Sequence, residues 1–175
     1  FSVFNSDKES FKAFKDRTTQ EAHDFGFHRY TTAAILADGA AWIWDYASTY
    51  HPYAIQILDY YHASEYLGNA LKSISVESEQ RELLFSWLQD GQIPKIVAWL
   101  LLQTSTTEIS TCIRYYEKNK ERMHYDQYKQ KGLNVGSGAI ESTHRTLSQA
   151  RMKQSGMHWG IANVQSMLSL RAMFL

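Results

Sequence analysis

The stretch TAAILADGAAWIWDYASTYHPYAIQILD, residues 32–59, predicts the centre of the fold. Its first and last parts, residues 32–37 and 53–58, are short apolar runs of the kind that forms buried parallel strands. Each run ends in an aspartate, Asp38 or Asp59, and the residues between the runs have the pattern of a short helix. Because a crossover of about a dozen residues joins two parallel strands, we expect a βαβ unit and an α/β fold.

The composition is that of an ordinary globular protein. The 175 residues are 44% hydrophobic and 21% charged, a balance that excludes a disordered chain. The length predicts one domain or slightly more. Cys112 is the single cysteine and cannot form an internal disulfide, which favours a reducing, cytoplasmic location. The longest apolar run, residues 96–102, is too short to cross a bilayer and no signal segment opens the chain, so we expect no membrane partner.

The net charge of zero hides an asymmetry along the chain. Residues 1–111 carry 8 Lys/Arg and 14 Asp/Glu, a balance of −6, whereas residues 112–175 carry 10 and 4, a balance of +6. From His144 to the end there are four basic residues and no acidic one. This asymmetry is typical of a C-terminal part that faces a polyanion. The alternative is that the two halves neutralise each other across an internal interface.

Helices are predicted on both sides of the βαβ unit. Residues 7–25 carry apolar side chains at three- and four-residue steps. Between residues 62 and 130 there is no good strand candidate, and amphipathic stretches predict a block of helices. The remaining stretches expected to be helical are 40–50, 63–75, 79–90, 93–104, 107–129, 137–153 and 161–172. The sequence therefore predicts a mostly helical α/β protein.

Asp38 and Asp59 follow the two predicted strands at their carboxyl ends. Ligands bind at this edge of open parallel sheets, and a carboxylate there is well placed to hold Mg²⁺, which prefers oxygen ligands. The alternative for Asp38 is a strand-ending turn with Gly39 or the cap of the next helix, positions where aspartate is favoured. The local residues leave both interpretations open.

Glu141 lies one turn into the helix that is predicted to follow the stretch Gly136-Ser-Gly138. Helical spacing places His144 and Arg145 on the same face. A single acid in a basic segment is unusual for a solvated face, which makes Glu141 a candidate site residue. The alternative is a first-turn glutamate stabilised by the helix dipole.

His62 and Glu65 lie three residues apart on one predicted helical face. Because no matching pair of cysteines or histidines occurs elsewhere, we expect His62 not to be a zinc ligand. Its place where strand character ends predicts a structural residue that ties the second strand to the helical block.

Three segments together resemble a known family. They are ADGAAWIW (37–44), ILDYYHASEYL (57–67) and GSGAIESTHRTLSQARMKQSGMHW (136–159). In this order they are similar to bacterial insertion-sequence DDE transposases of the ISKra type, which are distant relatives of Mutator-like elements. The resemblance covers most of residues 20–175.

The resemblance implies a partial RNase H-like core whose carboxylates bind two Mg²⁺ (or Mn²⁺) ions. Asp38 corresponds to the second catalytic aspartate and Glu141 to the catalytic glutamate, while the segment from Asp59 to His62 matches a structural Cys/Asp-x-x-His element. Such a site catalyses DNA cleavage and strand transfer, in enzymes that assemble as homo-oligomers. Because both acids would serve one metal pair, we expect their carboxylates to lie within about 10 Å of each other.

The resemblance also implies an organisation of the chain and a DNA interface. The parts are a partial core over residues 1–67, a helical insertion over 68–133 and C-terminal core helices with the catalytic glutamate over 134–175. Basic residues beside the site would neutralise DNA phosphates. These are Arg145, Arg151 and Lys153.

One departure from the family concerns its first catalytic aspartate. The family places this residue on a strand upstream of the helix at 7–25, and nothing before Asp7 has the pattern of that strand. The chain begins with Phe1 rather than Met, so we expect upstream residues to be missing and this chain alone to be catalytically incomplete. Two alternatives use the same residues: an RNase H-fold nuclease that only hydrolyses, and a non-catalytic DNA-binding or assembly module.

Overall fold

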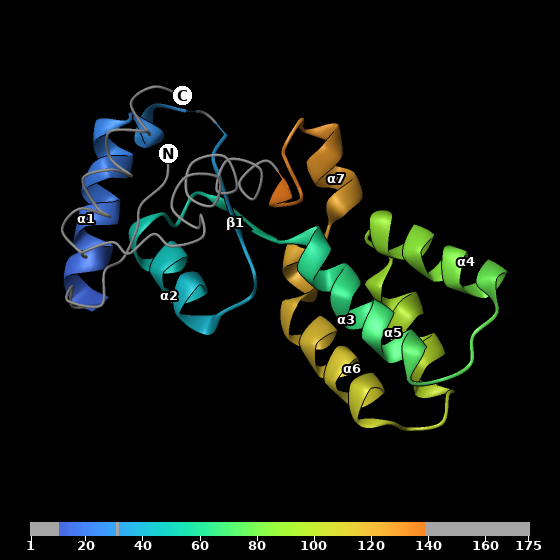
Figure 1. Ribbon diagram of the computed structural model, residues 1–175. Coiled ribbons are helices and arrows are strands. Elements are labelled where there is room, and N and C mark those ends of the chain that lie inside the picture. Colours follow the sequence, from blue (N-terminus) through green and yellow to red (C-terminus); the bar gives the residue numbers. More distant parts are fainter. Residues whose placement is uncertain (1–10, 31, 139–175) are drawn as a thin grey trace, which may run out of the picture. The chain divides into compact units, whose positions relative to one another are not determined.

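The computed structural model describes residues 11–30 and 32–138, and the structural statements below concern these residues (Figure 1). The chain divides into two compact units. Residues 29–137 form the larger unit, and the described residues of the other are 11–28 and Gly138. The strands and the helical block both belong to the larger unit.

Helix α1, Phe11–Asp24, confirms the described part of the helix expected over residues 7–25. An ion pair with helical i,i+4 spacing lies on its surface, where Lys12 Nζ is 2.7 Å from Asp16 Oδ2. An exposed pair of this kind stabilises a helix by only about 0.2–0.5 kcal/mol. A short 3₁₀ turn, η1, Phe27–Arg29, follows the helix.

Strands β1, Ala34–Ala37, and β2, Ile55–Leu58, form a two-stranded parallel sheet. Helix α2, Ala41–Tyr50, connects them, so the expected parallel βαβ unit is confirmed. Each strand begins two residues later than predicted. For β2 the reason is a turn, in which the Ala54 N–H donates to the His51 carbonyl at 3.0 Å and keeps the intervening residues out of the strand.

The helices expected between the second strand and residue 130 are present. They are α3, Tyr60–Lys72; α4, Ser78–Gln89; α5, Ile93–Leu101; α6, Thr107–Asn119; and α7, Tyr125–Gln130. In Figure 1, α3 and α6 lie side by side, and α4 and α5 complete the block. The expectation of a mostly helical α/β protein is therefore confirmed at this level of description. Within the described residues, no helix is both long and apolar enough to cross a membrane.

Several helix boundaries differ from the prediction, and α3 and α5 each end three residues earlier than expected. Helix α3 begins at Tyr60 rather than at residue 63, because Asp59 caps its first turn. The single helix expected over 107–129 is interrupted after Asn119 by the 3₁₀ turn η2, Lys120–Arg122. At the interruption Met123 is fully buried, so the chain leaves the α6 axis to place an apolar side chain in the core before α7 begins.

One apolar core runs from the sheet into the helical block. Ile57 and Leu58 of β2 are fully buried in the same cluster as Leu67 of α3 and Tyr116 of α6. The Tyr116 hydroxyl donates to the Ala63 carbonyl at 2.8 Å, which satisfies a polar group inside this core. The strands and the helices therefore stabilise each other as parts of one unit.

Arg122 of η2 fastens the end of α6 to the βαβ unit. Its guanidinium lies over the ring of Trp44 in α2, with 4.7 Å between Cζ and the ring centroid. Its Nε–H donates to Gln56 Oε1 in β2 at 2.8 Å. A cation over a tryptophan face combined with a side-chain hydrogen bond fixes the position of this turn against the strand.

Replacing Gly68 by alanine is expected to stabilise the protein. Gly68 is buried in the interior of α3, and a Cβ built on it has no heavy atom within 4 Å, so the methyl group fits. Alanine in a helix interior is favoured over glycine by about 0.5–1 kcal/mol. Urea unfolding followed by circular dichroism should show a midpoint that increases with an unchanged slope; a lower midpoint would contradict the open space around Gly68.

Candidate functional site

The two aspartates predicted to end the strands lie at one edge of the sheet. Ala37 and Leu58 are register partners in the parallel pair, and Asp38 and Asp59 are the next residue on each chain. The Asp59 N–H donates to the Ala37 carbonyl at 2.8 Å, which continues the pairing to the edge. The structure thus brings Asp38 and Asp59 to the carboxyl ends of neighbouring strands, as the sequence predicts.

Asp38 is exposed at this edge. Its Oδ1 accepts the Ala40 N–H at 3.0 Å, so its carboxylate closes a turn before α2, which is the alternative role raised by the sequence. The turn requires glycine at position 39, where φ is +97° and a Cβ would lie 3.0 Å from both Leu58 Cδ1 and the Tyr115 hydroxyl. An exposed carboxylate that uses one oxygen in a turn can still bind a solvated cation through the other.

Asp59 is in the opposite environment, with only 2% of its surface exposed. Its Oδ1 accepts the Tyr61 N–H at 2.7 Å and so caps α3. Its Oδ2 accepts the Ser137 N–H at 3.0 Å. Each carboxylate oxygen of Asp59 therefore already accepts a backbone hydrogen bond.

The segment Val135–Ser137 lies against this edge through three contacts. Besides the bond from Ser137 to Asp59, the Val135 carbonyl accepts the Tyr60 N–H at 2.8 Å. Gly136 packs on the ring of Tyr61 so closely that a Cβ would lie 2.7 Å from Tyr61 Cε2. Glycine at position 136 thus permits this close approach to a tyrosine of α3.

Tyr115 is a residue of this edge that the sequence did not indicate. Its hydroxyl, on α6, donates to the Asp38 carbonyl at 2.8 Å, and its ring stacks on Tyr66 of α3 with 3.8 Å between centroids. Burial raises the pKa of Tyr115, and Tyr66, Asp38 and Asp59 raise this pKa further. The hydroxyl therefore remains a protonated donor at neutral pH. No local pattern marks a tyrosine that contacts a residue 77 positions away.

His62 does not make the link that we expected of it. Its ring is half exposed on α3, and Nδ1 lies 4.0 Å from Glu65 Oε2 on the same helix. Among the described residues it is Asp59 that hydrogen-bonds both the start of α3 and Ser137, because Asp59 is buried whereas His62 is exposed. Within residues 11–30 and 32–138 no group of three or more His, Cys, Asp or Glu side chains could hold a metal ion.

Glu141, Arg145, Arg151 and Lys153 lie outside the described residues. The expected approach of Asp38 and Glu141, and the expected DNA contacts of the three basic residues, therefore remain predictions.

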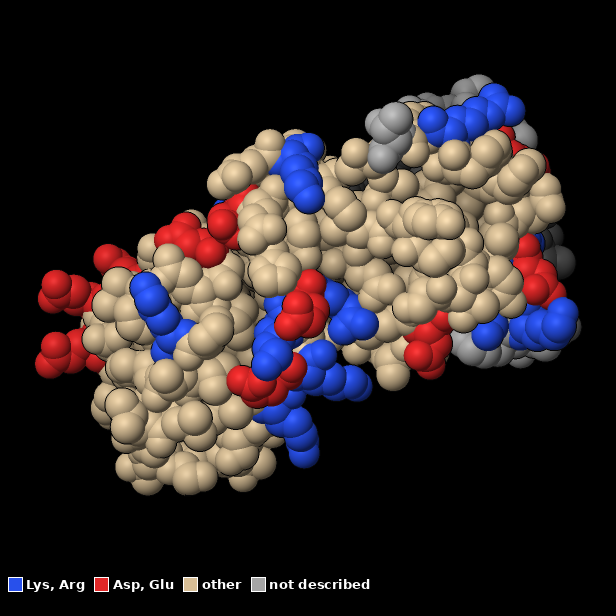
Figure 2. Space-filling model, turned by 180° about the vertical axis from the view of Figure 1, so that it is seen from behind, with Lys and Arg blue, Asp and Glu red and all other residues tan. Residues whose placement is uncertain are grey.

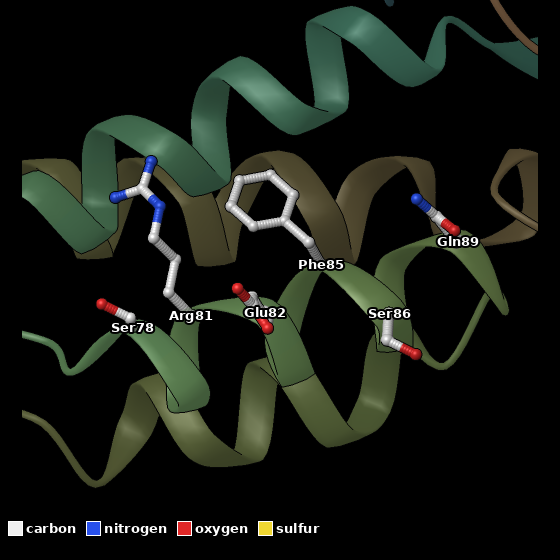
Figure 3. Close-up of a pocket in the computed structure, with 6 residues that line it drawn as sticks. All are labelled: Ser78, Arg81, Glu82, Phe85, Ser86 and Gln89. Atoms are coloured by element: carbon white, nitrogen blue, oxygen red, sulfur yellow. The ribbon is translucent and has the colours of Figure 1, made fainter.

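Two further surface features lie in the helical block. A shallow pocket of about 450 Å³ on α4 is lined by Ser78, Arg81, Glu82, Phe85, Ser86 and Gln89 (Figure 3). Its lining comes from a single helix, and the Arg81 guanidinium lies 5.6 Å from the Phe85 ring centroid. On the face shown in Figure 2, basic and acidic side chains are intermixed. In the helical block, Lys120 Nζ lies 3.0 Å from Glu117 Oε2. Neither feature adds residues to the sheet edge.

The comparisons with known proteins found no matching family model, no matching curated protein and no matching solved structure.

Proposed function

We propose that this chain is part of the catalytic region of a DDE-type DNA transposase, with an RNase H-like core and with Asp38 and Glu141 as metal-binding acids. The observation that carries the proposal is the sheet edge. An exposed Asp38 lies there at the end of β1, and Asp59 holds Ser137 at the end of β2. Glu141 follows Ser137 by four residues in the sequence.

The donor chemistry fits magnesium or manganese. Asp38 offers a hard oxygen at the edge where parallel sheets bind ligands, and Glu141 would supply the second carboxylate. Two bound ions would stabilise the attacking and leaving oxygens of an in-line phosphodiester displacement. The chain's own contribution is to hold the Asp38 turn rigid, through the Tyr115 hydroxyl and the glycine at position 39.

Removing either proposed metal ligand is expected to weaken Mn²⁺ binding. We expect Asp38→Asn and Glu141→Gln each to raise the Kd for Mn²⁺ at least about tenfold, because each removes a negative oxygen ligand from the same site. Asp45→Asn is the matched control, since it removes the same charge from an exposed position on α2. Free Mn²⁺ can be measured by electron paramagnetic resonance. Equal affinities in all four proteins would refute the metal site, and DNA binding without it would favour the non-catalytic alternative.

Basic residues after Glu141 are expected to contact DNA phosphates. Each phosphate contact contributes about −0.9 to the slope of log K against log salt. Replacing Arg151 and Lys153 together by glutamine should make this slope shallower by about two and weaken binding to all sequences alike. Fluorescence anisotropy with duplex DNA at several salt concentrations gives the slope. The control pair is Lys72→Gln with Lys131→Gln, two exposed positions of the helical block. An unchanged slope in a folded Arg151/Lys153 variant would show that these residues pair within the protein.

A further inference from the structure

We infer that Asp59 is a positioning residue: its carboxylate fastens the segment Val135–Ser137 to the end of β2, and it does not ligate a metal. The sequence offered Asp59 both as a possible cation ligand and as half of a structural motif with His62. In the structure Asp59 differs from Asp38, the other acid of the edge, because Asp59 is buried and both of its carboxylate oxygens accept hydrogen bonds.

The geometry of Asp59 is that of a carboxylate shared between two parts of the chain. Oδ1 accepts the N–H of Tyr61, two residues away, and Oδ2 accepts the N–H of Ser137, 78 residues away. A third bond, from the Tyr60 N–H to the Val135 carbonyl at 2.8 Å, joins the same two segments. The packing of Gly136 on Tyr61 fills the space between them.

The negative charge of Asp59 suits this position. The N-terminus of α3, a helix of 13 residues, carries partial positive charge that stabilises a carboxylate. Hydrogen bonds from N–H groups to a charged acceptor are stronger than those to a neutral one. An asparagine would keep one acceptor oxygen and would place an amide group, which only donates, against the second N–H. Serving both donors therefore requires a carboxylate.

The consequence for catalysis rests on the proposed function. If Asp38 and Glu141 hold the metal ions, Asp59 sets the place from which the chain runs toward Glu141, because it binds Ser137, four residues before Glu141 in the sequence. The two strand-ending acids then have separate roles: the exposed Asp38 binds the metal ions, and the buried Asp59 positions the segment Val135–Ser137.

Amide hydrogen exchange of the whole chain tests, without any activity assay, whether Asp59 holds the segment Val135–Ser137. In Asp59→Asn the remaining oxygen can still cap α3, since asparagine is a good N-cap residue. We therefore expect exchange at the Ser137 amide to increase about tenfold or more, and exchange at the Tyr61 amide to change less than about threefold. Asp59→Ser gives a second test, because serine caps helices but its short side chain serves one donor. Asp45→Asn is again the charge-matched control.

Two results would overturn the inference. One is unchanged exchange at the Ser137 amide in both Asp59 variants. The other is an equal increase in exchange at all amides of residues 29–137, which would mean that Asp59 only stabilises the unit as a helix cap. Mn²⁺ affinity measured on the same samples separates the proposals. Loss of Mn²⁺ binding in Asp59→Asn with an unchanged Ser137 amide would make Asp59 a ligand. A wild-type chain that binds no Mn²⁺ would refute the proposed function. The exchange result would still decide whether Asp59 holds the segment Val135–Ser137 at the end of β2.

Discussion

Raising the pH from 9 to 11 is expected to remove about 5 kcal/mol of the free energy of unfolding. Three fully buried groups of the helical block account for this loss: Cys112, Tyr116 and Tyr125. Burial raises the pKa of Cys112 to about 12 and raises the pKa of both tyrosines well above their ordinary value of 10. In the unfolded chain the same groups ionise near pH 9 and 10. The raised pKa of the less buried Tyr115 acts in the same direction.

The sign follows from these pKa values. Because the folded pKa of each group is above its unfolded pKa, the stabilisation is complete below pH 9. It is lost as the pH increases, since the unfolded chain then releases protons that the folded chain retains. Each such group contributes about 1.4 kcal/mol per pH unit above its unfolded pKa. The expected total is comparable with the whole stability of an ordinary domain.

Urea unfolding at pH 8, 9, 10 and 11, followed by circular dichroism, measures this loss. Cys112→Ala provides the control, because the variant should lose the part of the pH dependence that begins at pH 9 and keep the part that begins at pH 10. A free energy of unfolding that is constant from pH 8 to 11 would contradict the burial of these three side chains.

Gly91→Ala is expected to destabilise the protein by about 3 kcal/mol. Gly91 joins α4 to α5 with φ of +65°, a conformation that costs an L-residue about 1–2 kcal/mol. A Cβ at this position would lie 2.9 Å from the Met123 carbonyl oxygen and 3.3 Å from His124 Cα. Both neighbours are backbone atoms and cannot turn aside, so the packing cost adds to the conformational cost.

Gly132→Ala is the matched control for Gly91. Its φ is +70°, almost the same, but no heavy atom lies within 4 Å of a Cβ built there. This variant should therefore show only the conformational cost of about 1–2 kcal/mol. The difference between the two variants in urea unfolding measures the contact with Met123, and equal losses would show that the turn yields to the methyl group.

The sequence predicted those parts of the fold that depend on local patterns. Two short apolar runs separated by a helical stretch identified the parallel strands, and apolar spacing identified the helices between residues 60 and 130. The strand ends also placed Asp38 and Asp59 together, because the carboxyl ends of parallel strands meet at one edge.

The contacts that complete the candidate site had no local signal. The bond from Tyr115 to Asp38 joins residues 77 positions apart, and no periodicity marks either partner. The sequence also assigned the structural link to His62, whose ring is half exposed and lies near Glu65 of the same helix. The interruption after α6 was missed because residues 107–129 keep helical spacing, while burial of Met123 requires the chain to turn.

The two adjacent tyrosines of α6 have a consequence for synthesis of the chain on the ribosome. Tyr116 bonds to Ala63 within the helical block, whereas Tyr115 reaches back to the turn after β1. The βαβ unit emerges early in translation, but its edge lacks its partners until Tyr115 and then Ser137 have been added. This edge is therefore expected to be the last part of residues 29–137 to order during vectorial folding.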